Sequence, residues 1–188
     1  MRATGKPLSD LVAERIAAPL NLTATGFWTR DSTRLATAYQ PGPDGLETLD
    51  RPDGVFARPP PFLQLGSGLV TSAPDLLNFF CAMADGGRPV LKSDSVAVMT
   101  TDGLDGNQRR QARSILGPGV SWALATSVDV EMVEPWMAPR RWGWDGASGT
   151  TARVDPSRDH VAVLLTQRAM AGPDDRFDDF WAAVAATP

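Results

Sequence analysis

The chain has 188 residues, 43% of them hydrophobic and 21% charged, which is ordinary for one soluble globular domain. Its net charge of −4 argues against a protein that binds nucleic acid or an anionic membrane surface by charge alone. One cysteine and one histidine allow no intrachain disulfide and no ordinary zinc site, and no apolar run reaches the ~20 residues that span a bilayer. We therefore expect no metal, no cofactor and no membrane span.

The first third of the chain predicts one helix and a long irregular stretch. Apolar residues recur at helical spacing over residues 7–18, between Pro7 and Pro19, which suit the start and end of a helix. No apolar leader segment follows Met1, so the cytoplasm is the default expectation for location. Residues 28–65 contain several Pro-Gly turns without periodicity and predict a covering loop or disorder.

The middle of the chain predicts a second, better marked helix over residues 72–85. It opens with Ser-Ala-Pro-Asp, which resembles a capping box, and the glycine pair at 86–87 favours a stop. A short helix is expected over 94–99. Residues 102–119 are expected to form a loop, and the arginine cluster at 109–113 favours a solvated surface rather than a phosphate site.

The last third predicts strands. Residues 120–128 favour one strand, and residues 149–154 and 160–167 favour an antiparallel pair joined by the turn Asp-Pro-Ser-Arg-Asp. The strand at 160–167 is almost continuously apolar, so we expect it to be central and covered on both faces.

A final helix is expected over residues 174–186, with aromatic residues along one side. Together the elements predict an α+β fold in a single domain over 1–188. We expect a helical and loop region over 1–118, and the sheet strands with the C-terminal helix over 119–188.

Several residue types that often carry chemistry have ordinary structural interpretations here. Ser67 lies in Leu-Gly-Ser-Gly-Leu, which lacks the G-x-S-x-G spacing of a nucleophile elbow. No hydroxyl is tied to His160 by the sequence, and Cys81 sits in an apolar helix, where burial is the expectation. The aspartates at 174, 175, 178 and 179 suit a helix N-terminus, and they show no calcium-loop pattern.

The stretch Trp-Asp-Gly-Ala-Ser-Gly-Thr at 144–150 carries very little side-chain volume beneath its tryptophan. Small residues indicate that another group comes close to the backbone, and this group is either a substrate or another part of the protein. From these residues alone, a glycine-rich strand entry beneath an aromatic packing residue is favoured.

Four segments follow one another along the chain: GKPLSDLVAERIAAPLNLTATGF, GSGLVTSAPDLLNFFCAMADGG, LKSDSVAVMTT and GWDGASGTTARVDPSRDHVAVLLTQ. In this order they resemble the serine β-lactamase and penicillin-binding-protein family, and most closely its class C-like esterases. The likeness runs from about residue 5 to 184, which is nearly the whole chain. The resemblance implies a partial β-lactamase/transpeptidase-like fold whose N-terminal half is missing.

The family's third motif is K-T-G in penicillin-recognising members and often W-x-G in esterase-like ones, which Trp144, Asp145 and Gly146 match. The resemblance implies that these residues and Ala147 bind substrate, with the Ala147 N–H as one of two oxyanion-hole donors. Tryptophan in place of lysine removes the cation that meets a β-lactam carboxylate, which favours esters.

The family's nucleophile and base motifs are absent from these 188 residues. The only lysines are Lys6 and Lys92, and the residues three positions before them are Ala3 and Pro89, so there is no S-x-x-K. The single tyrosine, Tyr39, gives Tyr-Gln-Pro rather than Y-x-N. We therefore assign no catalytic residue, and we expect the chain to resemble the C-terminal half of such a protein and to be inactive alone.

Three functional interpretations stay open at this point. The chain is a truncated or misannotated hydrolase, or half of a split hydrolase completed by a partner chain, or a non-catalytic binding or interaction module. Strands missing from the sheet would leave an apolar edge open. We therefore expect completion by an N-terminal half or self-association, with a small ester or amide as substrate once completed, and no nucleic-acid partner.

Overall fold

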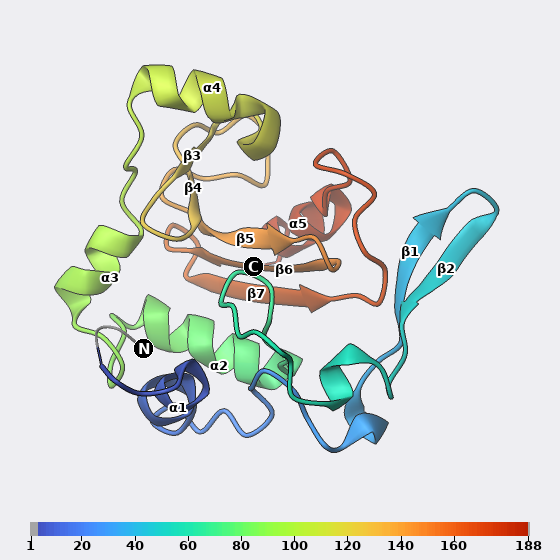
Figure 1. The fold of residues 1–188 in the computed structure, drawn as a ribbon. Coiled ribbons are helices and arrows are strands. Elements are labelled where there is room, and N and C mark those ends of the chain that lie inside the picture. Colours follow the sequence, from blue (N-terminus) through green and yellow to red (C-terminus); the bar gives the residue numbers. More distant parts are fainter. Residues whose placement is uncertain (1–3, 188) are drawn as a thin grey trace.

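A five-stranded antiparallel sheet forms the centre of the computed structural model, which describes residues 4–187 (Figure 1). Strands that follow one another in the chain are neighbours in the sheet, in the order β3-β4-β5-β6-β7. The predicted α+β class is confirmed. The strands are β3 (Val120–Trp122), β4 (Ser127–Asp129), β5 (Trp142–Gly146), β6 (Thr150–Asp155) and β7 (His160–Leu165).

The predicted antiparallel pair at the end of the sheet is confirmed, but its burial differs from expectation. β6 pairs with β7 along its whole length, from Thr150↔Leu165 to Asp155↔His160. β6 is the buried inner strand, whereas β7 is the last strand of the sheet and all six of its residues are only half-buried. An apolar run indicates that a strand needs cover, but it does not say whether a neighbouring strand is present to supply it.

The segment predicted as one strand at 120–128 forms two. Ala123 N–H donates to Thr126 O at 2.8 Å, and Ala125 has a positive φ of 151°, so the chain reverses between β3 and β4. β4 then pairs with only two residues of β5, Ser127 with Gly143 and Val128 with Trp142.

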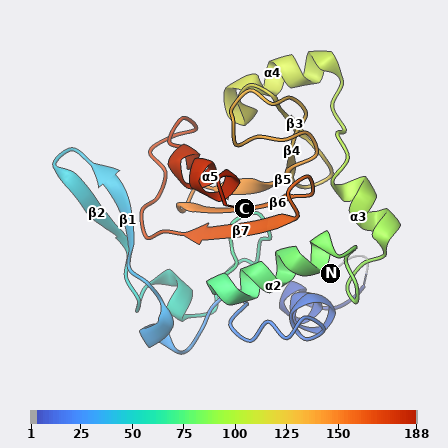
Figure 2. The same cartoon turned by 180° about the vertical axis from the view of Figure 1, so that it is seen from behind.

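Two helices pack on opposite faces of the sheet. α2 (Ala73–Ala84) contacts β6 and β7, and Phe80 stacks on Trp142 with ring centroids 5.5 Å apart. α5 (Asp178–Ala185) covers the other face through Trp181, which lies over Arg153 of β6, and it passes behind the sheet in Figure 1 and in front of it in Figure 2. Because side chains alternate along a strand, Trp142 and Trp144 point to the α2 face and Asp145 to the α5 face.

The helix predicted at 72–85 is confirmed together with its cap. Ser72 Oγ accepts from Asp75 N–H at 3.3 Å. The buried Asp75 carboxylate also accepts from Ala24 N–H and from the Thr25 hydroxyl, at 2.7 and 2.8 Å. The cap therefore anchors the first third of the chain on α2.

The first helix is present as α1 (Leu8–Val12), continued by a π-helical turn over Ala13–Ala17. The expectation of irregular structure over 28–65 is wrong in part, because β1 (Ala38–Gly42) and β2 (Gly45–Asp50) form a hairpin that projects from the body in Figure 1. Its Gly-Pro-Asp-Gly turn joins two strands rather than marking disorder. Two short 3₁₀ segments, Ser32–Arg34 and Val55–Ala57, flank the hairpin.

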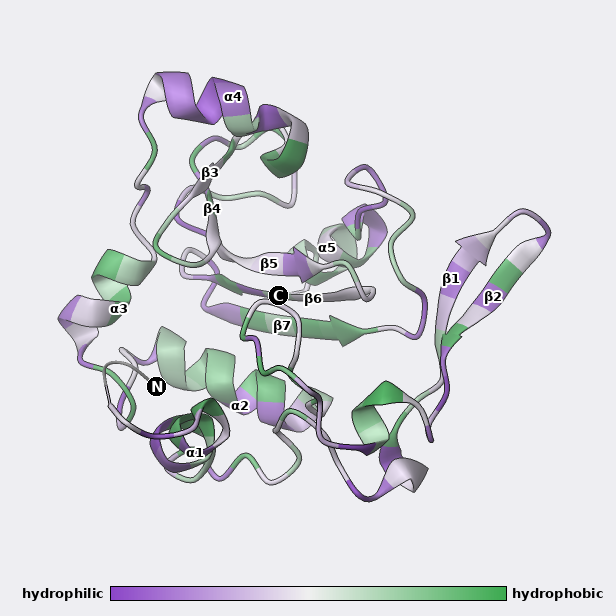
Figure 3. Ribbon diagram, in the orientation of Figure 1, coloured by the Kyte–Doolittle hydropathy of each residue, from purple (hydrophilic) through white to green (hydrophobic). Residues whose placement is uncertain are grey.

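The expected loop at 102–119 is also wrong, since α4 (Gly106–Leu116) occupies most of it. Asp105 accepts from the N–H groups of Asn107 and Gln108, and Gln108 Oε1 accepts from Asp105 N–H, which forms a capping box. Figure 3 shows α4 as mostly hydrophilic, and the arginine cluster lies on this exposed helix. α3 (Ser93–Met99) is close to its prediction, and α5 begins four residues later than expected.

No helix in the part of the chain described here is both long and apolar enough to cross a membrane.

Candidate functional site

The Trp-Asp-Gly-Ala motif occupies the end of β5 and the turn into β6. β4 leaves β5 after Gly143, so Trp144, Asp145 and Gly146 have a paired neighbour, β6, on one side only. Ala147 follows at the start of the turn and is exposed. An inner strand of the sheet therefore becomes an edge where the motif begins, with no strand paired to its free side.

Packing within the protein accounts for Gly149, one of the small residues that follow the motif. Gly149 has φ of +82°, and a Cβ there would lie 1.8 Å from Arg168 O, because the segment after β7 crosses close to the turn. Thr166 N–H donates to Gly149 O at 3.0 Å, and Met170 N–H donates to Ala147 O at 2.9 Å. The protein fills the space beside Gly149, whereas the free side of β5 remains open.

A hydrogen bond holds the carbonyl of Ala147, whereas the amide N–H of the same residue has no partner within residues 4–187. Its oxygen accepts from Met170, and Gly149 N–H donates to Gly146 O at 2.9 Å, so both ends of the turn are fixed. Within residues 4–187 the Ala147 N–H has no hydrogen-bond partner. An unpartnered N–H of an exposed residue on a fixed turn is a preorganised donor for an anionic oxygen.

Trp144 lies on the α2 face with 40% of its surface exposed. Its ring meets Trp122 of β3 edge to face, at 4.8 Å between centroids and 90° between planes. The sequence identified Trp144 but not Trp122, which is 22 positions away and meets it only because β3 folds back through β4.

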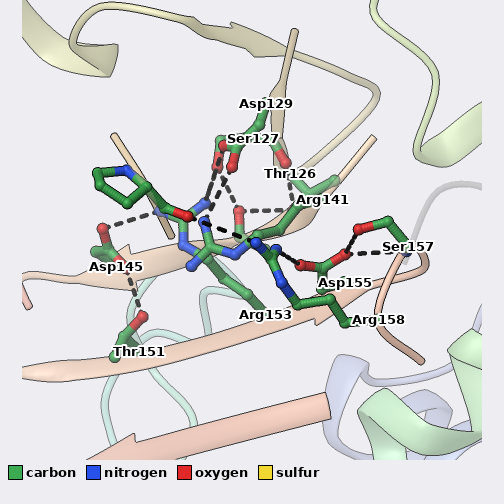
Figure 4. A network of polar contacts seen from close by, with 12 residues as sticks. Thr126, Ser127, Asp129, Arg141, Asp145, Thr151, Arg153, Asp155, Ser157 and Arg158 are labelled. Atoms are coloured by element: carbon green, nitrogen blue, oxygen red, sulfur yellow. Dashed lines mark hydrogen bonds and ion pairs between the residues drawn. The ribbon is translucent and has the colours of Figure 1, made fainter. Parts of the chain in front are cut away.

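Asp145 points away from Trp144 and into a polar network (Figure 4). Thr151 Oγ1 donates to its Oδ1 at 2.5 Å, and Arg153 Nη2 contacts its Oδ2 at 2.9 Å. These partners occupy both carboxylate oxygens. Asp145 therefore holds the motif strand to β6 and is not directed to the open side of β5.

The network continues into the sheet through a second, fully buried ion pair. Arg141 Nη1 lies 3.0 Å from Asp129 Oδ2, and Arg153 Nη1 lies 3.9 Å from Asp129 Oδ1 and 3.1 Å from Ser127 Oγ. Trp181 of α5 stacks on the Arg141 guanidinium at 4.4 Å. The network thus ties β4, β5, β6 and α5 together behind the motif.

Burial sets the ionisation behaviour of this network. It raises the pKa of the Asp129 carboxyl, against the opposing effect of the two arginines. Burial, and then repulsion from Arg153, lower the pKa of Arg141 to about 10. Both shifts reflect the cost of burying these charges, which their mutual pairing opposes.

The remaining sequence candidates lie away from the motif or serve other contacts. Ser67 is exposed and accepts from Gln64 Nε2 at 2.9 Å, and His160 begins β7 at the opposite end of the sheet from Gly146. Cys81 is exposed, which corrects the expectation of burial: it lies on a side of α2 that no other part of residues 4–187 covers. Among residues 4–187, no three His, Cys, Asp or Glu side chains gather as metal ligands.

A cavity of about 660 Å³ lies between α2, α3 and the end of the sheet marked by Trp142, Val154 and Val161. That end is about 13 Å along β5 from Gly146, at ~3.3 Å per residue. The chemistry of the motif, and not cavity size, therefore locates the candidate site.

Comparison with known proteins identifies the family. The family model named Beta-lactamase matches residues 1–187. This chain belongs to the beta-lactamase family. Protein Rv1367c of Mycobacterium tuberculosis is 32% identical over 200 residues, which take in all of this chain and 49% of that protein.

Solved structures with a beta-lactamase-like fold agree with this assignment. EstCE1, a hydrolase with promiscuous acyltransferase activity, superposes with a TM-score of 0.75 at 24% identity, over 96% of this chain and 51% of that one. Selenomethionyl simvastatin synthase LovD from Aspergillus terreus gives 0.79 at 21% identity, over 98% and 51%. The fold expected from the resemblance is confirmed, and the chain spans about half the length of these relatives, as expected for a C-terminal half.

Proposed function

We propose that the chain supplies the third-motif wall, and one oxyanion donor, of a β-lactamase-related serine hydrolase site for small carboxylic esters or amides. The observation that carries the proposal is the N–H of Ala147, an exposed residue just after β5: it has no partner within residues 4–187, while Met170 fixes the carbonyl. Membership of the beta-lactamase family supports the reaction class.

The donor acts on charge that develops during acyl transfer. When a serine Oγ attacks the substrate carbonyl, the base takes up the hydroxyl proton, the C=O π electrons move to oxygen, and a fixed N–H stabilises that oxyanion. The carbonyl then re-forms as the C–O or C–N bond to the leaving group breaks, and the leaving group takes up the proton from the base, now acting as the general acid. Water then attacks the acyl-enzyme in the same way, which releases the carboxylic acid and restores the serine hydroxyl. Loss of one such donor costs about 10²–10³ in kcat.

The attacking hydroxyl and its base must come from another segment, because these 188 residues contain neither S-x-x-K nor Y-x-N. The outer edge of β7 suits the arrival of that segment, since it is the last strand of the sheet and its apolar residues are half-buried. The proposed partner is therefore a complementing N-terminal half, which adds a strand beside β7.

Hydrolysis of p-nitrophenyl butyrate and nitrocefin tests the proposal. We expect the chain alone to match buffer, and the chain joined to an N-terminal family segment carrying S-x-x-K and Y-x-N to hydrolyse the ester. In that joined protein, Ala147→Pro removes the N–H and should lower kcat by about 10²–10³, whereas Ala147→Ser keeps the N–H and much of the activity.

Two results would contradict the proposal. Turnover by the chain alone that survives Ser67→Ala, or a fluorophosphonate adduct on any of its serines, would show that a nucleophile is present. Full activity of the Ala147→Pro joined protein would refute the oxyanion role of the Ala147 N–H. Size-exclusion chromatography with thermal melting tests the open edge: a monomer that melts cooperatively would count against completion by a second polypeptide.

A further inference from the structure

Two tryptophans from different strands, the half-buried Trp122 and the exposed Trp144 of the motif, form a partly exposed aromatic surface. β4 begins at Ser127, which pairs with Trp122 on one side and Gly143 on the other, so no β4 side chain separates Trp122 from Trp144. The two rings therefore meet beyond the end of β4, at 4.8 Å between centroids. We call Trp122 and Trp144 the tryptophan pair.

A mostly apolar cavity of about 560 Å³ reaches one member of the tryptophan pair, Trp122. Val98, Leu104 and Leu124 line it together with Trp122, and Leu124 is 65% exposed, whereas Trp144 meets the cavity only through its contact with Trp122. Exposed apolar groups that line a hollow mark a surface suited to an apolar ligand.

The charges around this cavity favour a ligand without a carboxylate. Asp102 is the only charged residue in the lining. Its carboxylate is already occupied by Arg109 at 2.9 Å and by the hydroxyl of Ser121. An anionic ligand would meet this carboxylate and no lysine or arginine from the lining.

We propose that the tryptophan pair binds a neutral aromatic group of the substrate, so that the completed site takes aryl esters in preference to carboxylate-bearing β-lactams. The inference rests on the proposed function for the position of the reacting carbonyl, at the Ala147 N–H. Trp144 lies three residues before Ala147, about 10 Å along the strand, a distance that a short substituted ester bridges. Aromatic groups pack edge to face or offset on indole rings, as Trp122 and Trp144 already do with each other.

Fluorine NMR of the chain carrying 5-fluorotryptophan measures this binding without turnover. The chain has six tryptophans, and substitution of single tryptophans assigns the signals. The probe is 4-phenylbutan-2-one, an inert ketone with the shape of an ester, and its matched anion is 3-phenylpropionate. We expect the ketone to shift the signals of Trp122 and Trp144 in a saturable way and to bind at least threefold more tightly than the anion.

Variants separate the tryptophan pair from general apolar binding. Trp144→Leu should weaken ketone binding at least threefold. Trp28 is half-buried and stacks on Arg30 rather than on either member of the pair, so Trp28→Phe should leave ketone binding unchanged. Magnetisation transfer from the phenyl protons of the ketone to both rings of the pair, in the unmutated chain, gives the same answer if Trp144→Leu fails to fold.

The inference is overturned if the ketone causes no saturable shift at the pair, if the anion binds equally well, or if Trp28→Phe weakens binding as much as Trp144→Leu. Different results would refute the proposed function. An inactive joined protein whose tryptophan pair still binds the ketone refutes the hydrolase proposal and keeps the aromatic site, whereas an active one without ketone binding refutes only the aromatic site.

Discussion

Replacement of Asp129 by asparagine tests whether the buried network holds the sheet together behind the motif. The Asp129 side chain is 1% exposed and lies 3.0 Å from Arg141, whose side chain is 3% exposed. Asparagine keeps the shape and removes the charge, so Arg141 stays buried without its ion-pair partner. Breaking a buried pair from one side typically costs about 3–5 kcal/mol.

The structure places the expected loss near the lower end of that range. Arg153 keeps Asp145 at 2.9 Å, and the Arg141 guanidinium keeps its stacking on Trp136 at 4.9 Å and on Trp181 at 4.4 Å. We therefore expect Asp129→Asn to lower the free energy of unfolding by about 3 kcal/mol. For a chain of this size, that loss lowers Tm by about 6–12 °C.

Urea unfolding followed by tryptophan fluorescence measures the loss, because two tryptophans stack on the network. Glu14→Gln is the control, since its pair with Lys6 is more than 50% exposed on both sides and should contribute at most ~1 kcal/mol. The double variant Asp129→Leu/Arg141→Met removes both charges and should recover most of the stability. Equal losses for Asp129→Asn and Glu14→Gln would refute the reasoning.

Three further variants test the backbone and the caps. Gly143→Ala should lower the free energy of unfolding by about 2 kcal/mol or more, because φ is +153° and the new Cβ would lie 2.0 Å from Ala152 O; an unchanged urea midpoint would contradict this. Ser72→Ala removes the cap of α2 at Asp75 N–H and should cost about 1 kcal/mol in the same assay, with loss of helical circular dichroism on mild heating. Burial raises the pKa of Asp155, but hydrogen bonds from the following turn outweigh it and hold the pKa below 3.8. The stabilisation that these hydrogen bonds give to the ionised carboxylate is therefore present above pH 3.8 and lost as pH falls through the folded pKa. Asp155→Asn should lower the free energy of unfolding by about 1.5 kcal/mol at neutral pH and by progressively less in acid. A cost that does not change with pH would contradict the assignment.

Elements with strong local signals were predictable. The cap at Ser72 and the glycines after α2 fix that helix within the chain, and the turn after Asp155 joins two strands that are adjacent in sequence. α4 was missed although its Asp-x-x-Gln capping box was present, because its polar residues carry no apolar period. The β1–β2 hairpin was missed because β1 is mostly half-buried and β2 mostly exposed, so neither strand shows the alternation that burial of one face imposes.

The sequence by itself determined the order of the family segments, the absence of S-x-x-K and Y-x-N, and the small residues of the motif. Only the tertiary structure decided that β4 leaves β5 at Gly143 and frees the edge beside Ala147, that Asp145 turns inward to Arg153, and that Trp122 meets Trp144. These contacts join residues on different strands, and their geometry follows from strand register and from where each strand ends. Local sequence encodes neither, because both are set by the packing of the whole sheet.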